Sequence, residues 1–366
     1  MIEFARSELA DDIVQRDADG QFSRAAWQAC ATFGIQGLPI PRQYGGGEVD
    51  PLTFTIAMEA LGYGCADNGL LFALGAQICS VEAPLARFGT EEQQATYLPA
   101  LCDGSMVGAH AMSEPDSGSD AFSLATTAER RDGHYVLNGS KRFITSGPEA
   151  DFVLVFARTK PTGGFAGVSA FLVERSTRGL LIGPPVSKMG LRTVPMGELT
   201  FEDCVVPENH LLGKPGSGFA IFNYSMEWER SHIFAGAVGA MQRQLEQVIV
   251  HARDRQQFGQ PIGRFQAVSH RIVDLELRVR TSRLLLYEVA WMRSQGRPAA
   301  LESAMAKLWL SESFLASSLD ALFVHGGIGY LSETGVERDV RDAVGGCIYS
   351  GTSDIQRNVI AARLGL

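Results

Sequence analysis

The hydrophobic pattern changes twice along the chain, and this change restricts the fold more than any other feature. Residues 1 to about 108, and those from about 216 onward, carry apolar residues at helical spacing, whereas the stretch between them alternates apolar and polar residues among Gly and Pro turns. Helices and strands in separate blocks predict an α+β multi-domain protein. We therefore expect an N-terminal α-helical domain (1–108), a small antiparallel β-barrel or sandwich (109–215) and a C-terminal helical bundle (216–366).

Local signals support each block. Thr90 and Gln93 have the spacing of a capping box, in which two side chains bond to orphan N–H groups at a helix start. Asn138-Gly139 lies between two apolar runs and predicts a two-residue hairpin, because both residues tolerate positive φ. Long helical patterns in the last block run over about 219–252, 265–295 and 299–324.

Composition narrows the class of protein. Hydrophobic residues make up 45% and charged residues 20% of the 366 positions, as in a soluble globular protein. The formal net charge of -9 argues against a nucleic-acid partner, which requires a basic face. The N-terminus lacks the features of a signal peptide, and no run approaches ~18 apolar residues, so we expect no membrane span and a cytoplasmic location.

The cysteines and histidines show no metal-binding pattern. None of the six cysteines forms a C-x-x-C pair, and none of the seven histidines forms an H-E-x-x-H motif. We expect reduced, mostly buried thiols and no metal site.

An acidic residue interrupts the apolar face of the helix expected from about residue 219. Phe222, Met226 and Ile233 share one face with position 229, which is Glu. Burial would raise the pKa of this carboxyl towards neutrality, as a general base requires. Periodicity alone leaves two other interpretations of Glu229, namely an ordinary ion pair with Arg230 or the edge of an apolar stripe that reaches solvent.

Two segments with glycines suit the close approach of a ligand. Residues 111–120 form a polar turn whose hydroxyl and N–H groups fit an anion or a flavin ring, although such turns are common. Gly326 and Gly327 follow a helix, where they either allow close backbone approach or simply cap the helix. His232 lies three residues after Glu229 and either shares its site or is an ordinary core histidine.

Six motifs follow one another in a fixed order. They are MSEPDSGSD (112–120), KRFITSG (141–147), KMGLR (188–192), RQQFG (255–259), GGIGY (326–330) and GTSDIQ (351–356). Together they resemble the acyl-CoA dehydrogenase family over nearly the whole chain. The resemblance implies an N-terminal helical domain, a central antiparallel β-barrel domain and a C-terminal four-helix bundle, in agreement with the block pattern.

The resemblance also implies FAD as the cofactor and assigns residues to its flavin end. Ser113 and Thr145 would form hydrogen bonds with the polar edge of the ring, and Met112 and Phe143 would line the ring. Gly118 and Ser119 would lie near the cofactor and the thioester arm of the substrate.

The other cofactor contacts implied by the resemblance come from later motifs. Arg255 and Phe258 would reach FAD across a subunit interface, so the family pattern implies a homodimer or a homotetramer. Gly326 and Gly327 would approach the pyrophosphate. Thr352 and Asp354 would contact the adenine half.

This chain departs from the family pattern at the catalytic base. Ser350 occupies the position of the glutamate that usually removes the α-proton of the substrate, and only its backbone N–H, a donor to the thioester carbonyl, is retained. A few branches of the family place the base directly before an arginine that binds the substrate, here Arg230. The resemblance therefore selects Glu229 as the base, the same acid that the helical periodicity indicates. Phe143 replaces a common tryptophan, and Phe323 replaces a glutamine that often contacts the flavin.

We therefore expect an FAD-dependent dehydrogenase that oxidises an acyl thioester on an acyl carrier protein or on CoA. In its short length and in the change to serine, the chain resembles dehydrogenases of polyketide extender-unit pathways. Those enzymes act on small polar hydroxymalonyl or methoxymalonyl precursors bound to a carrier. The alternatives are an ordinary acyl-CoA dehydrogenase of short or branched chains, an oxygen-using oxidase or monooxygenase of the same fold, and a non-catalytic flavoprotein. The sequence does not identify the electron acceptor.

Overall fold

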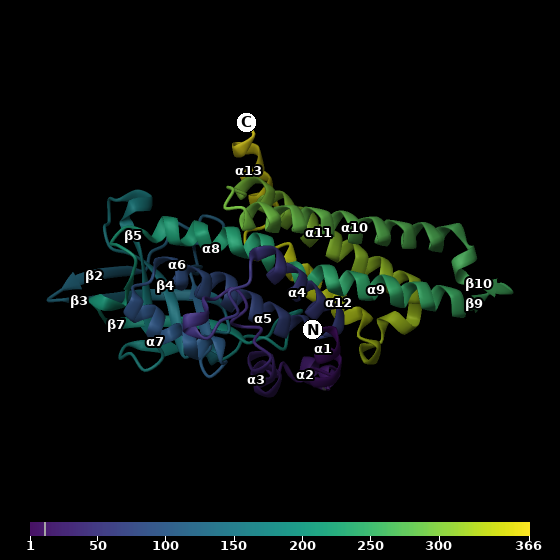
Figure 1. Cartoon of the computed structure of the whole chain (residues 1–366), viewed down its shortest axis with the longest axis horizontal. Coiled ribbons are helices and arrows are strands. Elements are labelled where there is room, and N and C mark those ends of the chain that lie inside the picture. Colours follow the sequence, from purple (N-terminus) through teal and green to yellow (C-terminus); the bar gives the residue numbers. More distant parts are fainter. Residues whose placement is uncertain (11) are drawn as a thin grey trace.

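The computed structural model describes residues 1–10 and 12–366, and it has the three expected parts (Figure 1). The first part consists of helices that pack against the sheet and against the long helices of the last part. The capping box predicted at Thr90 and Gln93 is confirmed at the start of α7. The helices of this part are α1 (Ile2–Glu8), α2 (Ile13–Asp19), α3 (Arg24–Thr32), α4 (Pro51–Gly64), α5 (Asn68–Gln77), α6 (Ala83–Phe88) and α7 (Glu91–Cys102).

The middle part is an eight-stranded sheet with the strand order β6-β7-β3-β2-β4-β5-β8, and β1 pairs with β4. Most pairs are antiparallel, as predicted, but β1 runs parallel to β4, and β2 meets β4 in a parallel contact. The sheet is therefore mixed. Its strands are β1 (Gly108–Ala111), β2 (Thr127–Arg131), β3 (His134–Thr145), β4 (Phe152–Arg158), β5 (Val168–Glu174), β6 (Leu180–Ile182), β7 (Met196–Pro207) and β8 (Leu211–Leu212).

The hairpin predicted at Asn138-Gly139 is wrong. Both residues lie inside β3, where the pairing with β7 shifts register. A β-bulge explains the pattern, because Asn138 exchanges side-chain and backbone hydrogen bonds with Asp203 on the partner strand. The turn lies instead at Asp132-Gly133, where both residues have positive φ, as a two-residue hairpin requires.

The third part contains the long helices, which extend away from the sheet in Figure 1. The helices expected at 265–295 and 299–324 are confirmed, but the helix expected at 219–252 is two helices that meet at Ile233 and Phe234. Phe234 is fully buried and stacks on Tyr349. The helices are α8 (Gly218–His232), α9 (Ala235–Asp254), α10 (Gln266–Ser294), α11 (Ala300–His325), α12 (Val336–Gly346) and α13 (Ser353–Arg363), with the short strands β9 (Gln256–Gln257) and β10 (Gln260–Pro261) between α9 and α10.

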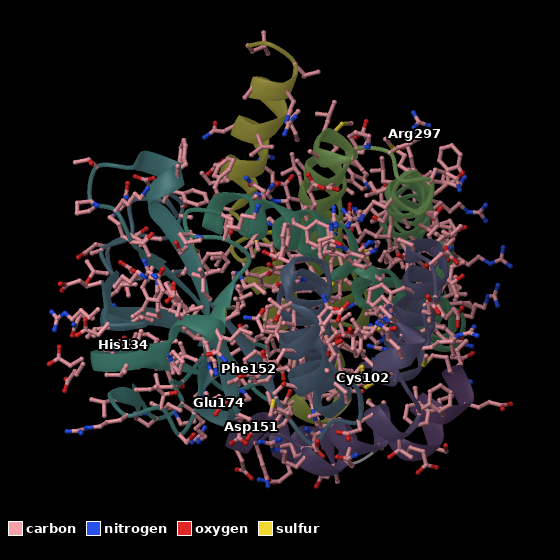
Figure 2. All side chains as sticks on the ribbon, turned by 60° about the vertical axis from the view of Figure 1, so that its left-hand side comes forward. Cys102, His134, Asp151, Phe152, Glu174 and Arg297 are labelled. Atoms are coloured by element: carbon pink, nitrogen blue, oxygen red, sulfur yellow. The ribbon has the colours of Figure 1, made fainter. Side chains whose placement is uncertain are left out.

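The first part is joined to the sheet by both packing and hydrogen bonds. Tyr97 of α7 stacks on the fully buried Phe152 of β4, with ring centroids 4.9 Å apart, and donates a hydrogen bond to Glu174 of β5. Asp151 accepts a hydrogen bond from the N–H of Val107 just before β1. Figure 2 shows Asp151, Phe152 and Glu174 close together, at the end of the sheet where β4 begins and β5 ends. These contacts fix how the helices sit against the sheet.

Glycines allow α4 and α9 to cross with their backbones in contact. A Cβ atom at Gly62 would lie 2.1 Å from the carbonyl oxygen of Gly236, and one at Gly239 would lie 2.1 Å from that of Glu59. Real side chains do not approach backbone atoms this closely. The crossing therefore requires small residues, and it places the end of α8, with Glu229, against the N-terminal helices.

One continuous helical stretch, Asn68–Phe88, is long and apolar enough to cross a membrane by length and composition. Within the protein, 89% of its apolar window is buried. A single helix of this kind is weak evidence for a membrane span, because the core helix of a soluble protein passes the same test. Five of the six cysteines are buried, and Cys347 is partly exposed.

The substitution Gly239→Ala tests the crossing of α4 and α9. Its methyl group would overlap backbone of α4, so we expect a loss of about 1–3 kcal/mol and a fall in Tm of a few °C. Gly236→Ala, on the same helix, is the matched control. Its Cβ would meet only the mobile end of Leu71 at 3.3 Å, so the better helix propensity of Ala should leave Tm unchanged or higher. Equal effects in thermal unfolding would contradict this account.

Candidate functional site

A cavity of about 900 Å³ lies where the three parts of the chain meet. The polar turn after β1 and the end of β3 line it from the sheet. Helix α5 and α8 line it from the helical parts, and the loop after β6 and the segment after α12 complete it. The wall therefore combines segments that are far apart in the sequence. Glu229 and Ser350 are both among its lining residues.

Glu229 is half-buried on α8 and faces this cavity. Each of its carboxylate oxygens accepts a hydrogen bond from a serine hydroxyl. Ser350 Oγ donates to Oε1 at 2.7 Å, and Ser80 Oγ donates to Oε2 at 3.0 Å. A carboxylate oxygen can accept two hydrogen bonds, so each oxygen keeps a free lone pair that can receive a proton.

Burial raises the pKa of Glu229 above its ordinary value, while the hydrogen bonds from Ser350 and Ser80 and the nearby charges of Arg230 and Lys307 oppose this shift. Across the described residues, no ion pair joins Glu229 to Arg230, so the interpretation of Glu229 as an ordinary ion-paired residue is not supported. Burial also lowers the pKa of Lys307, to about 8. The result is a carboxyl group of raised pKa that two hydroxyl groups hold in one direction, and these are properties that a general base requires.

Ser350 adopts a backbone conformation with φ of 56°, which non-glycine residues rarely adopt. Its carbonyl oxygen accepts a hydrogen bond from the amide of Gln356, which is fully buried and also bonds to Gly351. Within residues 1–10 and 12–366, the N–H of Ser350 has no hydrogen-bond partner. Ser350 also lines the cavity, and its hydroxyl is the group that contacts Glu229.

A buried ion pair supports the polar turn that lines the cavity. Lys141 of β3 is fully buried and donates to the carboxylate of Glu114 and to the carbonyl oxygen of Met112. Glu114 in turn accepts hydrogen bonds from the N–H groups of Ala125 and Thr126. Burial lowers the pKa of Lys141 to about 8, although Glu114 opposes the shift. The start of the turn is thus fixed to β3 and to the segment at 125–126.

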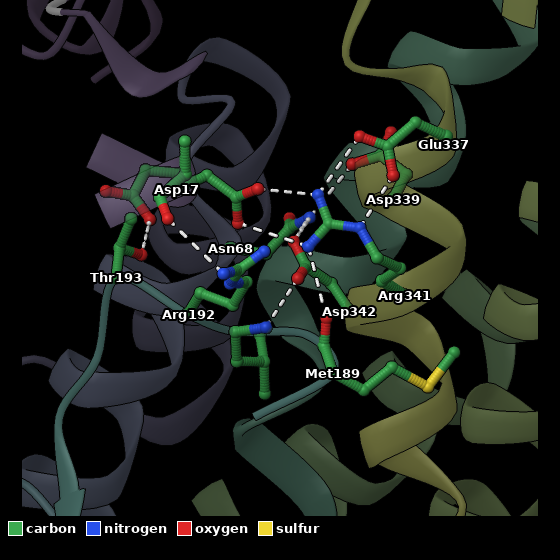
Figure 3. Close-up of polar contacts among 12 residues, drawn as sticks. Asp17, Asn68, Met189, Arg192, Thr193, Glu337, Asp339, Arg341 and Asp342 are labelled. Carbon is green, nitrogen blue, oxygen red and sulfur yellow. Dashed lines mark hydrogen bonds and ion pairs between the residues drawn. The ribbon is translucent and has the colours of Figure 1, made fainter. Parts of the chain in front are cut away.

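The opposite wall, residues 187–194, is held by a charged cluster (Figure 3). Arg341 of α12 bonds to Asp17 of α2 and to the carbonyl oxygen of Met189. Asp342 accepts a hydrogen bond from the N–H of Leu191 and another from Asn68. Burial raises the pKa of Asp342 to about 7. The cluster joins the first and third parts of the chain to the cavity wall.

The residues assigned to the flavin end by resemblance lie together in the cavity wall. The ring of Phe143 is 57% exposed there, and its φ is 59°. A Cβ at Gly118 would meet no atom of the described chain within 4 Å. An exposed aromatic face, an open glycine and hydroxyl groups fit a flat, polar-edged ring such as a flavin. The predicted residues that line the cavity are Met112, Ser113, Gly118, Ser119, Phe143, Thr145, Glu229, Arg230, Ser350 and Thr352.

Five other predicted cofactor residues do not line the cavity of this chain. Arg255 is exposed at the end of α9, and Phe258 is 92% exposed in the turn between β9 and β10. Gly326 and Gly327 are exposed after α11, and Gly326 caps this helix with φ of 62°. Asp354 projects into solvent. Their assignment to FAD stays a prediction that requires a second chain or an extended cofactor.

Two further residues are placed by the structure away from the cavity. His232 is buried, and its Nδ1 lies 2.8 Å from the hydroxyl of Thr55, so it is a core histidine. Burial keeps its pKa well below the ordinary value. Phe323 is exposed on α11, where Arg271 lies over its ring.

Sequence reasoning did not find Ser80, the second hydrogen-bond donor to Glu229. It also did not find the aromatic pair Phe72 and Tyr349, whose ring centroids are 4.4 Å apart beside the cavity. A single serine in the apolar stretch 69–88 is a weak signal, because helices accept buried serines that bond to their own backbone. Only the fold brings position 80 to position 229.

Family models match almost the whole chain. The N-terminal, middle and C-terminal domains of acyl-CoA dehydrogenase match residues 1–105, 109–204 and 216–365. An L-prolyl-[peptidyl-carrier protein] dehydrogenase of Pseudomonas fluorescens is 46% identical over 94% of this chain and 91% of its own length. A protein of the same name from a Serratia species is 41% identical over 98% of this chain and 94% of its own length.

Solved structures of similar proteins have the same fold. The prolyl acyl carrier protein oxidase AnaB has a TM-score of 0.99 and 49% identity, covering all of this chain and 97% of that one. The structure of PigA with FAD and proline has a TM-score of 0.98 and 41% identity, covering all of this chain and 95% of the other. The predicted fold and the predicted FAD cofactor are thereby confirmed. The chain belongs to the acyl-CoA dehydrogenase family, whose members use FAD to oxidise acyl thioesters.

Proposed function

We propose that this protein oxidises an L-prolyl group held as a thioester on a peptidyl carrier protein, with Glu229 as the general base. The observation that carries the proposal is a carboxylate of raised pKa that faces the cavity and is oriented by two hydroxyl groups. The identity of 46% and 41% to two L-prolyl-[peptidyl-carrier protein] dehydrogenases supports the substrate.

The lining around Glu229 fits a small ring. Phe72, Ala76 and Ser80 follow one another at four-residue intervals and all line the cavity. Tyr349 packs against Phe72 and lies next to Ser350 in sequence. These apolar faces suit the methylene groups of a five-membered ring, whereas the serines and the carboxylate lie where its α-carbon would react.

In the proposed reaction, a carboxylate oxygen of Glu229 takes the proton from the α-carbon of the prolyl thioester. The α-hydrogen is a very weak acid, so the negative charge that develops on the thioester oxygen needs a donor. We assign this role to the N–H of Ser350, which has no partner among the described residues. When bound, FAD supplies the acceptor for the hydride that leaves the neighbouring carbon. One proton and one hydride are removed, and the acyl group gains a double bond.

Three alternatives to this proposal can be compared with it, namely an extender-unit substrate, an oxidase and a non-catalytic flavoprotein. We prefer a prolyl group to the extender-unit substrate, since the two relatives are named L-prolyl-[peptidyl-carrier protein] dehydrogenases. An oxidase that returns electrons to O2 remains a second candidate, because AnaB is named an oxidase. A non-catalytic flavoprotein would not need a base held by two hydroxyls.

The variant Glu229→Gln tests the base. The amide keeps the shape of the side chain but cannot accept the proton, so we expect flavin reduction to slow by more than ~100-fold. Ser350→Ala should cost far less, because the N–H at that position is retained. The measurement is the rate of flavin bleaching after anaerobic mixing with the acyl thioester. A faster reaction in Glu229→Gln than in Ser350→Ala would refute the assignment.

A panel of thioesters tests the substrate. We expect the holoenzyme to be bleached anaerobically by L-prolyl carrier protein, and much more slowly by L-prolyl-CoA, butyryl-CoA or a carrier loaded with a small polar C3 acyl group. Bleaching by butyryl-CoA alone would indicate an ordinary acyl-CoA dehydrogenase. Admitting air to the reduced enzyme distinguishes a dehydrogenase from an oxidase, because reoxidation of the flavin within seconds with release of H2O2 indicates an oxidase.

We further propose a homodimer or homotetramer in solution. Large apolar side chains are exposed on the long helices, including Leu284 at 70% and Trp309 at 44%, and Phe258 is almost fully exposed. Sedimentation should show a species of two or four chains of 39.5 kDa each. Leu284→Glu should shift it towards smaller species, and a monomer in the wild-type protein would contradict the proposal.

A further inference from the structure

Ser80 lies in a π-helical turn between two α-helices. The turn spans Ile78–Glu82, with α5 before it and α6 after it. A π-turn holds one residue more than an α-turn, so it rotates the side chains that follow, and such turns are frequent at functional sites. Ser80 is 2% exposed, and it lines the cavity.

A side-chain bridge spans the turn from end to end. The amide of Gln77 donates to the carboxyl of Glu82 at 2.8 Å, and its oxygen accepts from the N–H of Gly108 in β1 at 2.8 Å. Glu82 is fully buried, and burial raises its pKa to about 8, which favours the neutral acid. The amide of Gln77 therefore ties both ends of the π-turn to each other and to the sheet.

From these contacts we infer that Ser80 is a positioning residue, which holds Glu229 together with Ser350 so that the carboxylate is both ionised and aimed at the substrate. The inference rests on the proposed function of Glu229. Ser80 belongs to the N-terminal part and Ser350 to the C-terminal end, so the two hydroxyls bind the two oxygens from different segments. Fixing both oxygens removes the rotation about the last bond of the side chain.

The two hydroxyl groups also favour the ionised form of the Glu229 carboxyl group. A hydroxyl that donates to a carboxylate stabilises the ionised form, and hydrogen bonds to charged groups are the stronger ones. The charged and titratable groups that face Glu229 are Arg230 on its own helix, Lys307 on α11, Tyr349 beside Ser350 and Cys79 beside Ser80. Burial raises the pKa of both Cys79 and Tyr349, so these two remain neutral at pH 7, and only the two cations assist the serines.

The test is the pH dependence of flavin reduction in Ser80→Ala, measured by anaerobic stopped-flow at saturating acyl thioester. Without the hydroxyl, the pKa of Glu229 rises further. The part of the profile in which the rate increases with pH should therefore move up by roughly one pH unit, and at a given pH on that rising part the rate should fall about ten-fold. Ser80→Thr keeps the hydroxyl and should return the rising part towards that of the wild type. Titration of the substrate amine is common to all variants and cancels in the comparison.

Ser225→Ala is the matched control. Ser225 is also a fully buried serine, one turn before Glu229, but its hydroxyl donates only to the carbonyl oxygen of Phe222. It should leave the pH profile unchanged. If Ser80→Ala does not give a folded, FAD-containing protein, Ser80→Cys keeps the shape with a weaker donor and should show the same direction of shift.

The outcomes separate this inference from the proposed function. If Glu229→Gln is inactive but Ser80→Ala and Ser80→Cys follow the wild-type profile, Glu229 is the base and Ser80 does not position it. If Ser80→Ala slows the reaction equally at every pH, and Ser225→Ala does the same, the effect is structural and the inference fails. If Glu229→Gln is as fast as the wild type, the proposed function itself fails.

Discussion

A desolvated carboxylate held by two serine hydroxyls is the interaction on which the site depends. Glu229 faces the cavity from the end of α8, and its two oxygens bind Ser80 and Ser350, from the first and last parts of the chain. An ionised carboxylate away from water is costly unless each oxygen is hydrogen-bonded. The three parts must therefore pack together before this side chain can be held in the cavity wall by both hydroxyl groups.

The cavity around this carboxylate is also held by charged groups, three of which, Lys141, Glu114 and Asp342, are buried. Lys141 and Glu114 fix the polar turn on one side, and Arg341 and Asp342 fix residues 187–194 on the other. Buried pairs of this kind contribute little net stability, but removing one partner is costly. The wall also contains rare backbone conformations, since Phe143, Leu191 and Ser350 all have positive φ and all line the cavity. Asp342 bonds to Leu191, and Gln356 bonds to Ser350.

Local patterns predicted local features and failed where tertiary contacts override them. The capping box of α7 and the helices α10 and α11 follow from spacing alone, because their signals lie within a few residues of one another. The local pattern at Asn138-Gly139 likewise predicts a turn. In the structure, the hydrogen bonds between Asn138 and Asp203 of β7 form a β-bulge instead. The break at Phe234 was not predictable either, since apolar spacing continues through it while Phe234 packs under Tyr349.

The sequence by itself determined the three-part organisation, the family and the identity of the candidate base, because periodicity and motif order are properties of the chain alone. Only the tertiary structure decided what holds this base. Ser80 precedes Glu229 by 149 residues and Ser350 follows it by 121, and no local pattern relates positions so distant. A hydrogen bond requires two atoms within about 3 Å, and this proximity exists only after the helices and the sheet have closed around the cavity.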